Sequence, residues 1–488
     1  MKRKLSIPFT LLMILLLAAA VTGCGQPAGE EAAANVQEAA EEAVEEVAEE
    51  GAGEEAETAA GTTEAVIGFT ASQTGNLTVE STNQINGLNL CMAQIEEAGG
   101  IPLADGTRVT FSSVYYDDES NTDRVQELYT RLATEDNADF LISPYSSGLA
   151  DAAAVISEQY GKVMITTGAA SDTTYQKGFS NVFQAYTPAS RYLTGALDLL
   201  GVEDPDARKI AIIYENTQFS TDVAAAAQAY AQELGYEIVL YEGYDTNTTD
   251  FAPFINRIVD SAPDAILGGG HFQDGSTFVK QLHEKNVDVK MVVLLVAPPE
   301  PSFAELGEAA IGVIGPSQWE PQADFNPEAA SEAGMEFYGP SSGEFTEMFV
   351  AEYGEDPSYH AAGGYVACLL LQKAIEDAGS LDSSAVRDAL DAMDVVTFFG
   401  HMQFDTSPEN HGLQTGHSMV YIQWQEKDGE LVKEVVADQR RVGRRDELTA
   451  AEGLEHAVGE GAKVQRVHLD RPVVQQLQPA DVLEVETI

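Results

Sequence analysis

Basic residues are scarce in this 488-residue chain: 26 Lys and Arg stand against 79 Asp and Glu, for a formal net charge of −53. A surface of that sign repels nucleic acid and anionic lipid, so we expect no nucleic-acid partner. Twelve of the glutamates lie in residues 25–62, so most of the acidic excess falls on the rest of the chain.

Some familiar catalytic and metal-binding motifs are missing as well. The chain has no P-loop and no HExxH, and its three cysteines form neither a CxxC pair nor a cluster with histidine. Paired carboxylates are abundant, but 79 acids produce such pairs by chance. We therefore expect no enzyme, no bound metal and no cofactor.

Two of the cysteines lie far from the N-terminus, Cys91 in GLNLCMAQI and Cys368 in YVACLLLQKAI. Both stretches are apolar and helix-like, and free cysteine is among the most buried residue types. We favour two free, buried thiols. A disulfide stays open as the alternative, because an oxidising compartment outside the cytoplasm permits one.

The N-terminus carries the pattern of an export signal. Residues 2–4 are basic, residues 11–20 are apolar, and the stretch ends in Val21-Thr22-Gly23-Cys24. This order is typical of a signal peptide and is too short for a stable transmembrane helix. The last four residues resemble a bacterial lipobox, which implies a lipidated Cys24 and an extracytoplasmic protein anchored to the membrane. The alternative is an ordinary cleaved signal with an incidental cysteine.

Residues 25–62 differ from the rest of the chain in composition. They hold no Lys, Arg or aromatic residue, so they cannot bury enough apolar surface to fold. We expect a disordered, self-repelling linker that holds the folded part away from the membrane. An unconstrained tail without that role is the alternative.

From residue 65 onward, short apolar runs alternate with amphipathic stretches, and this series occurs twice. Such alternation predicts βαβ crossovers and parallel sheets, and therefore two doubly wound α/β lobes. The predicted strands cover 65–71, 109–116, 139–144 and 162–168 in the first series, and 209–215, 237–243, 264–270 and 289–296 in the second. The predicted helices cover 83–97, 120–135, 149–160, 220–234, 250–260 and 274–285.

Small and polar residues follow many of these strands. In open α/β sheets, ligands bind beyond the carboxyl ends of the strands, where small residues let backbone N–H groups approach them. The clusters are Ser72–Gly75, Ser146–Gly148, Gly168–Ser171, Glu215–Thr217 and His271–Asp274. Each cluster alone is a weak signal, but their recurrence in both halves indicates a ligand site between the lobes.

Several motifs also occur in a fixed order between residues 65 and 437. They are IGFTASQTGN, VYYDDESN, LISPYSSGLADAAAVI, MITTGAASDTTYQKGF, FTEMFVAEYGEDPSYHAAGGYVACLLLQKAI and FFGHMQFD. Together they resemble the branched-chain amino-acid (Leu/Ile/Val) binding family, the type I periplasmic solute-binding proteins of ABC importers. The resemblance implies two lobes joined by three crossovers, with a cleft that closes over an amino acid or related small polar solute. It also implies delivery to ABC permease subunits, and we expect a monomer.

The resemblance implies boundaries for the lobes. The crossovers would fall near Tyr186–Pro188, Gln318–Pro321 and Gly400–Phe404. Lobe 1 would comprise residues 65–186 and 320–400, and lobe 2 residues 187–319 and 401–437.

The family binds the α-carboxylate of its ligand with a serine and neighbouring backbone groups. The matching serine here is Ser147, after Tyr145 and Ser146, and the matching loop is Gly168, Ala169 and Ala170, with Ser171 beside it. Several convergent N–H donors and a hydroxyl can hold a carboxylate without a cation. A helix N-cap for 149–160 is the alternative role for Ser147.

Two departures from the family bear on the rest of the ligand. A family tyrosine falls on Glu80, and the family glutamate that pairs with the α-ammonium falls near 295–297, where the nearest carboxylate is Glu300. A ligand cation would then need Glu80, Glu215 or Glu300. Family aromatic positions fall on His271 and Phe219; Trp319 near a crossover could cap the cleft, and Tyr145 could narrow it. Glu80 on a solvated face and His271 as a structural residue are the alternatives.

The last segment, 438–488, again differs in composition. It holds seven of the chain's Lys and Arg residues and no Phe, Tyr, Trp or Met. We expect this tail to lie outside the fold, with a short appendage that binds an acidic partner as the alternative. For the whole chain, a ligand-sensing receptor module is the alternative to transport, because the type I fold serves both.

Overall fold

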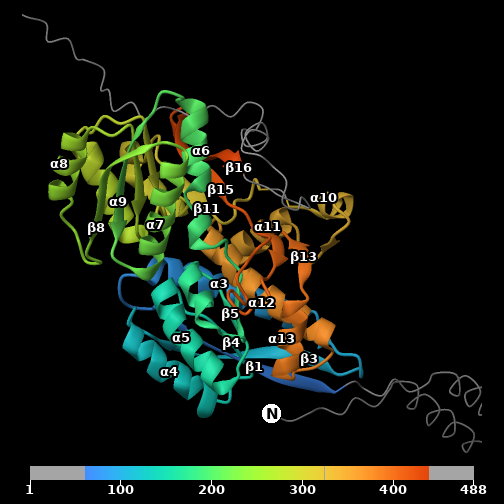
Figure 1. Ribbon diagram of the computed structural model, residues 1–488. Helices are drawn as coiled ribbons and strands as arrows, with labels where there is room; N and C mark the ends of the chain where they lie inside the picture. The colour runs from blue at the N-terminus through green and yellow to red at the C-terminus, as the bar shows by residue number, and fades with distance from the viewer. Residues whose placement is uncertain (1–60, 324, 439–488) are drawn as a thin grey trace, which may run out of the picture. The chain divides into compact units, whose positions relative to one another are not determined.

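The computed structural model describes residues 61–323 and 325–438 (Figure 1). The lipobox at Cys24, nearly all of the predicted linker and the tail after Asp438 lie outside the described residues. Three β-sheets are formed within the described part of the chain. Every strand and helix predicted between residues 65 and 296 is present, and most of them have shifted ends.

The first sheet has the strand order β2-β3-β1-β4-β5-β6. Neighbours from β3 to β6 are parallel, and β2 is antiparallel to β3. All three residues of β4 are apolar and buried, as expected for a parallel strand covered on both faces. The bounds are Thr62–Ala71 for β1, Ile101–Pro102 for β2, Arg108–Asp117 for β3, Phe140–Ile142 for β4, Met164–Thr166 for β5 and Val182–Gln184 for β6.

The second sheet has the order β16-β15-β11-β10-β9-β7-β8. The strands from β8 to β11 are parallel, and β15 and β16 form an antiparallel hairpin that joins the sheet at β11. The bounds are Lys209–Glu215 for β7, Glu237–Tyr244 for β8, Ala265–Gly269 for β9, Met291–Leu294 for β10, Ile314–Ser317 for β11, Val420–Lys427 for β15 and Glu430–Asp438 for β16.

Helices pack on both sheets, and α4 shows why these segments are helical. Its buried residues Val125, Leu128, Tyr129 and Leu132 recur at helical spacing, and the Asn121 side chain caps its first turn. The helices of the first sheet are α3 (Thr78–Glu97), α4 (Thr122–Thr134), α5 (Ser147–Tyr160), α12 (Tyr359–Ala378) and α13 (Ser383–Asp391). Those of the second sheet are α6 (Thr194–Glu203), α7 (Gln218–Glu233), α8 (Ala252–Ser261) and α9 (Phe272–Glu284). We call each sheet with its helices the first and the second lobe.

Helices α3 and α12 lie side by side in the first lobe (Figure 1). A Cβ atom at Gly87 would lie 1.8 Å from the carbonyl oxygen of Ala361, and one at Gly364 would lie 1.9 Å from that of Gln84. The two glycines therefore permit backbone contact between the helices. At this crossing Cys91 and Cys368 form a disulfide with a Cα–Cα distance of 6.2 Å. The prediction of two free thiols was wrong, because neither apolar run shows which helix it will cross.

The chain passes between the lobes three times, and the three passages meet. The backbone N–H of Thr187 donates to Gln318 Oε1 at 2.9 Å, and the Thr187 hydroxyl hydrogen-bonds His417 Nδ1. Residues 187, 318 and 417 therefore meet between the last strand of the first sheet, β6, and strands of the second sheet.

The third passage lies later in the chain than predicted. Residues 400–403 form β14 (Gly400–Gln403), which pairs with β13 (Asp394–Thr397) and, through it, with β12 (Glu336–Phe337) in a small third sheet. The following segment still contacts the first lobe, since Gln184 N–H donates to the carbonyl of Gly412 at 2.9 Å. The chain enters the second sheet only at β15, so a crossover at Gly400–Phe404 was placed too early.

Two shorter helices, α10 (Pro327–Glu332) and α11 (Ser342–Tyr353), lie between the second passage and α12. Among the residues that the structure describes, none of the helices combines the length and the apolar character needed to cross a bilayer.

Candidate functional site

A small cavity lies between the two lobes. Most of its lining comes from loops and helix starts that follow the strands of both sheets, and aromatic rings predominate. The lining residues are Tyr145, Ser146, Ser147, Gly168, Ala170, Tyr186, Tyr192, Phe219, His271, Val296, Tyr359 and His360. Apolar and aromatic walls with a few polar groups are typical of small-molecule sites.

The predicted serine, Ser147, lines the cavity, but its hydroxyl is already hydrogen-bonded within the protein. Ser147 is the first residue of α5, and Ser146 holds the N-cap position without a side-chain cap bond. Ser147 Oγ accepts from the N–H groups of Ala170 and Ser171, at 3.0 and 3.1 Å. These are two of the donors that the resemblance assigns to a ligand carboxylate. Ser147 therefore joins the two loops rather than capping the helix.

Two other members of that predicted set lie outside the lining. Ala169 is buried behind the cavity wall, and its carbonyl accepts a hydrogen bond from Gln184. The Ser171 hydroxyl instead contacts Asp222 and Gln218 on α7 of the second lobe. This serine contributes to the contact between the lobes.

Glu80 lies in the first turn of α3 and is fully buried. Its Oε1 accepts from the backbone N–H of Phe272, the first residue of α9 in the second lobe, at 2.9 Å. Its Oε2 is buried without a hydrogen-bond partner. Burial raises the pKa of Glu80, and the charges of His271 and His360 oppose that rise. Glu80 is not on a solvated face; it bridges the lobes beside the cavity and does not line it.

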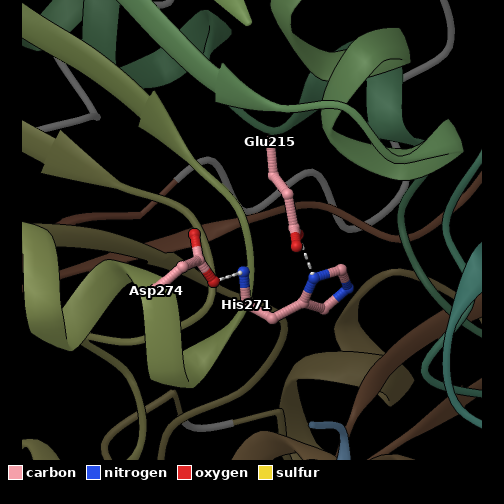
Figure 2. A group of neighbouring side chains, drawn as sticks. All are labelled: Glu215, His271 and Asp274. Atoms are coloured by element: carbon pink, nitrogen blue, oxygen red, sulfur yellow. Dashed lines mark hydrogen bonds and ion pairs between the residues drawn. The ribbon is translucent and has the colours of Figure 1, made fainter. Parts of the chain in front are cut away.

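His271 does line the cavity, and a network of buried groups fixes its ring. Its Nδ1 lies 2.6 Å from Glu215 Oε2 at the end of β7. Its backbone N–H donates to Asp274 Oδ1 at 2.7 Å, in the capping box that starts α9. Figure 2 shows Glu215 and Asp274 on either side of His271. The remaining ring nitrogen, Nε2, is buried without a partner.

This network shifts two pKa values. Burial lowers the pKa of His271, but the charge of Glu215 and its hydrogen bond outweigh that effect and raise it to about 9. Burial and the nearby charge of Glu215 raise the pKa of Asp274 to about 7. His271 is therefore an imidazolium at neutral pH, with an N–H at Nε2.

The same three side chains are also the group that could hold a metal ion, since one ligand atom from each lies within 4.8 Å of the others. Glu215 and the His271 ring are already bonded to each other, and Asp274 accepts from the His271 backbone N–H and from the Tyr244 hydroxyl. A metal would have to displace the Glu215–His271 bond. The residues fit a closed hydrogen-bond network better than a metal site.

A second histidine–carboxylate pair, absent from the sequence prediction, lies on the other side of the cavity. His360 Nδ1 bonds Glu300 Oε1, and Glu300 Oε2 accepts from Asn83 Nδ2 at 3.0 Å. His360 opens α12 in the first lobe, whereas Glu300 follows β10 of the second lobe. His360 also lines the cavity, and its Nε2 is buried without a partner. In the sequence it stands at the start of an apolar run, with no signal of a site.

Of the aromatic residues predicted for the site, Phe219 and Tyr145 line the cavity and Trp319 does not. The Tyr145 ring meets the His271 and His360 rings edge-on, with centroids 5.8 and 5.0 Å away. Trp319 does not cap the cleft. It is fully buried against Phe345 and Phe398 in the core, and its indole N–H donates to Ser342.

Similarity to known proteins identifies the family of this two-lobed chain. A family model described as periplasmic binding protein matches residues 64–430. The chain belongs to this family. A relative named Leu/Ile/Val-binding protein homolog 7, from Brucella melitensis, is 26% identical over 376 residues, which cover 73% of this chain and 88% of that protein.

Solved structures agree on the fold. The branched-chain amino acid transporter substrate-binding protein LivJ of Streptococcus pneumoniae, in complex with isoleucine, has a TM-score of 0.62 at 22% identity and covers 77% of this chain and 99% of its own. A solute-binding protein of an ABC transporter from R. palustris, in complex with benzoate, has a TM-score of 0.62 at 20% identity and covers 78% of this chain and 100% of its own. The predicted family and the type I periplasmic-binding-protein fold are confirmed. The chain is thus a substrate-binding protein of an extracytoplasmic family.

Proposed function

We propose that this periplasmic binding protein captures an amino acid or a related small polar solute in the cavity between its lobes and delivers it to the permease of an ABC importer. The observation that carries the proposal is the cavity itself, which both lobes line and whose lining includes His271 and His360, each with a buried Nε2 that has no hydrogen-bond partner. Buried polar atoms without partners are costly unless a ligand supplies the missing hydrogen bonds. The names of the relatives support amino-acid binding, and benzoate in one neighbour marks the competing class.

Capture would proceed by closure of the lobes. Contacts between Glu80 and Phe272 and between Glu300 and His360 join the lobes directly. In an open form these groups would meet water, and the cavity would be accessible. A solute that completes the hydrogen bonds of the cavity would stabilise the closed form, and the closed form is the one that we propose docks on the permease.

The proposal includes no catalytic role. A GxSxG string does occur at residues 339–343, but Ser341 holds the N-cap position of α11. Its hydroxyl bonds Glu344 within a capping box. The nucleophile of such a motif needs a base such as histidine, and a helix cap provides none.

Thermal unfolding of the full chain with a panel of solutes tests the proposal. The panel comprises aliphatic, amide and acidic amino acids, short amides, urea and hydroxybenzoates. A solute present at one hundred times its Kd should add about 2.7 kcal/mol to the free energy of unfolding. If no amino acid changes the unfolding midpoint and hydroxybenzoates shift it, the bound solute is an aromatic acid rather than an amino acid. No shift with any solute would contradict solute capture.

We further propose that Cys24 carries the membrane anchor, on the basis of the Val21–Cys24 sequence. Cys24→Ser should move the protein from the membrane to the soluble fraction of the cells, because the lipid is attached through the thiol. Cell fractionation with a salt wash measures this. A variant that stays with the membranes would contradict a lipid anchor.

A further inference from the structure

Two buried imidazoles face the cavity from opposite lobes in the same way. His271 and His360 are 4% and 0% exposed, and each uses Nδ1 to bond a glutamate. An ionised carboxylate only accepts hydrogen bonds, so each Nδ1 carries the proton and each ring is held in one orientation. The other nitrogen of each ring, Nε2, is buried and has no hydrogen-bond partner.

The Nε2 atoms of His271 and His360 restrict which solutes can bind tightly. A branched aliphatic side chain offers nothing to an imidazole nitrogen, and leaving a buried polar atom unsatisfied lowers affinity about tenfold or more. A site built to hydrogen-bond a polar group rejects the analogue that lacks it. The edges of the two rings flank Tyr145, whose ring fills the wall between them.

We propose that His271 and His360 bind the polar end of the solute, and that the cavity selects an amino acid whose side chain ends in a carboxamide over leucine, isoleucine or valine. This inference rests on the proposed function and names its substrate class. A carboxamide has a carbonyl oxygen that accepts and an N–H group that donates. It can therefore hydrogen-bond the Nε2 atoms of both rings, whether such an atom donates or accepts.

Charge separates the carboxamide from a carboxylate. The buried carboxyl groups of Glu215 and Glu300 each already bond one of the two histidines. A further carboxylate would add negative charge to this set, in a buried region where water screens little. A side-chain amide presents the same oxygen to the His271 N–H without that charge.

The wild-type chain allows a first test by titration calorimetry with glutamine, asparagine, glutamate and leucine. We expect the better of the two amides to bind at least tenfold more tightly than leucine and than glutamate. Leucine bound as tightly as the amides would overturn the inference and leave the proposed function standing. Glutamate bound more tightly would overturn the carboxamide assignment. Binding of none of the four would overturn the inference and leave the proposed function to the solute panel.

Variants of the two histidines then test whether their Nε2 atoms bind the solute. His271→Asn and His360→Asn each keep an N–H at about the place of Nδ1, for the glutamate, and remove Nε2. Each should weaken amide binding at least tenfold and shrink the preference over leucine. His401→Asn is the matched control, because His401 pairs with Asp394 on β13, away from the cavity. Amide affinities that are equal in all four proteins would overturn the inference, and circular dichroism verifies that each variant is folded.

Discussion

The two histidine–carboxylate pairs beside the cavity share their chemistry but join different parts of the chain. His271 and Glu215 both belong to the second lobe, at the ends of β9 and β7. His360 belongs to the first lobe and Glu300 to the second. Separation of the lobes would leave the first pair intact and break the second. One pair therefore stabilises a lobe, and the other stabilises the closed arrangement of two lobes.

Removal of the carboxylate from the pair within one lobe should have the largest effect. Glu215→Ala would leave the His271 imidazolium buried without its partner, and breaking a buried pair in this way costs about 3–5 kcal/mol. Urea unfolding without solute measures the loss. The control is Glu242→Ala, which breaks a partly exposed pair with Arg257 and should cost less than about 1 kcal/mol. Equal losses in the two variants would contradict a structural role for the Glu215–His271 pair.

Loss of the disulfide should have the second-largest effect. It joins α3, which carries Glu80 and Asn83, to α12, which carries His360. Replacing Cys91 and Cys368 by alanine opens a loop of 277 residues, and loss of such a cross-link is worth about 2–4 kcal/mol of stability. We expect that loss in urea unfolding, with solute affinity changed less than by Glu300→Gln. Full retention of stability, or the same midpoint for the wild type with and without reductant, would contradict it.

Glu300→Gln tests the pair between the lobes. Glutamine keeps the shape of the side chain, but the lost charge weakens the bond to His360 only when the lobes are closed. Solute affinity should therefore fall about tenfold to a hundredfold, or about 1.4–2.7 kcal/mol. The free energy of unfolding without solute should fall less than in Glu215→Ala. Calorimetry measures the affinity, and urea unfolding measures the stability. An unchanged Kd together with a large loss of stability would mean that the Glu300–His360 pair stabilises the folded chain rather than the closed arrangement of the lobes.

The smallest effect is the pH dependence that His271 contributes. Its pKa is raised to about 9 in the folded chain, against about 6.5 for an unperturbed histidine. The folded state then holds the proton more tightly, so this stability is complete below about pH 6.5 and is lost as the pH rises through 9. Between pH 7 and 8 the loss should be about 1 kcal/mol. His271→Asn should lack this slope in urea unfolding, and equal slopes would place the titration elsewhere.

The secondary structure was predictable because its signals are local. The apolar run KIAIIYE predicts strand 209–215, and β7 spans Lys209–Glu215. The start of α3 was missed by several residues, because its first turn, Thr78–Glu80, is polar even though Glu80 is buried. Five residues of the strand-end clusters line the cavity: Ser146, Ser147, Gly168, Ala170 and His271.

The errors concern residues whose partners lie far along the chain. Trp319 near a crossover looked like a cap for the cleft, but Phe345 and Phe398 enclose it in the core. Glu300 was considered as the partner of a ligand cation, but it bonds His360, which lies 60 residues later. Neither pairing has a spacing or motif that a reader of the sequence could recognise.

By itself, the sequence determined the alternation of strands and helices and the family, because period, turn residues and ordered motifs act over short stretches of chain. Only the tertiary structure decided that Cys91 meets Cys368, that Ser147 ties two loops together, and that two imidazoles face one cavity from different lobes. These outcomes depend on how α3 crosses α12 and how far the lobes close. Such packing sums many weak contacts between distant segments, and no local pattern records it.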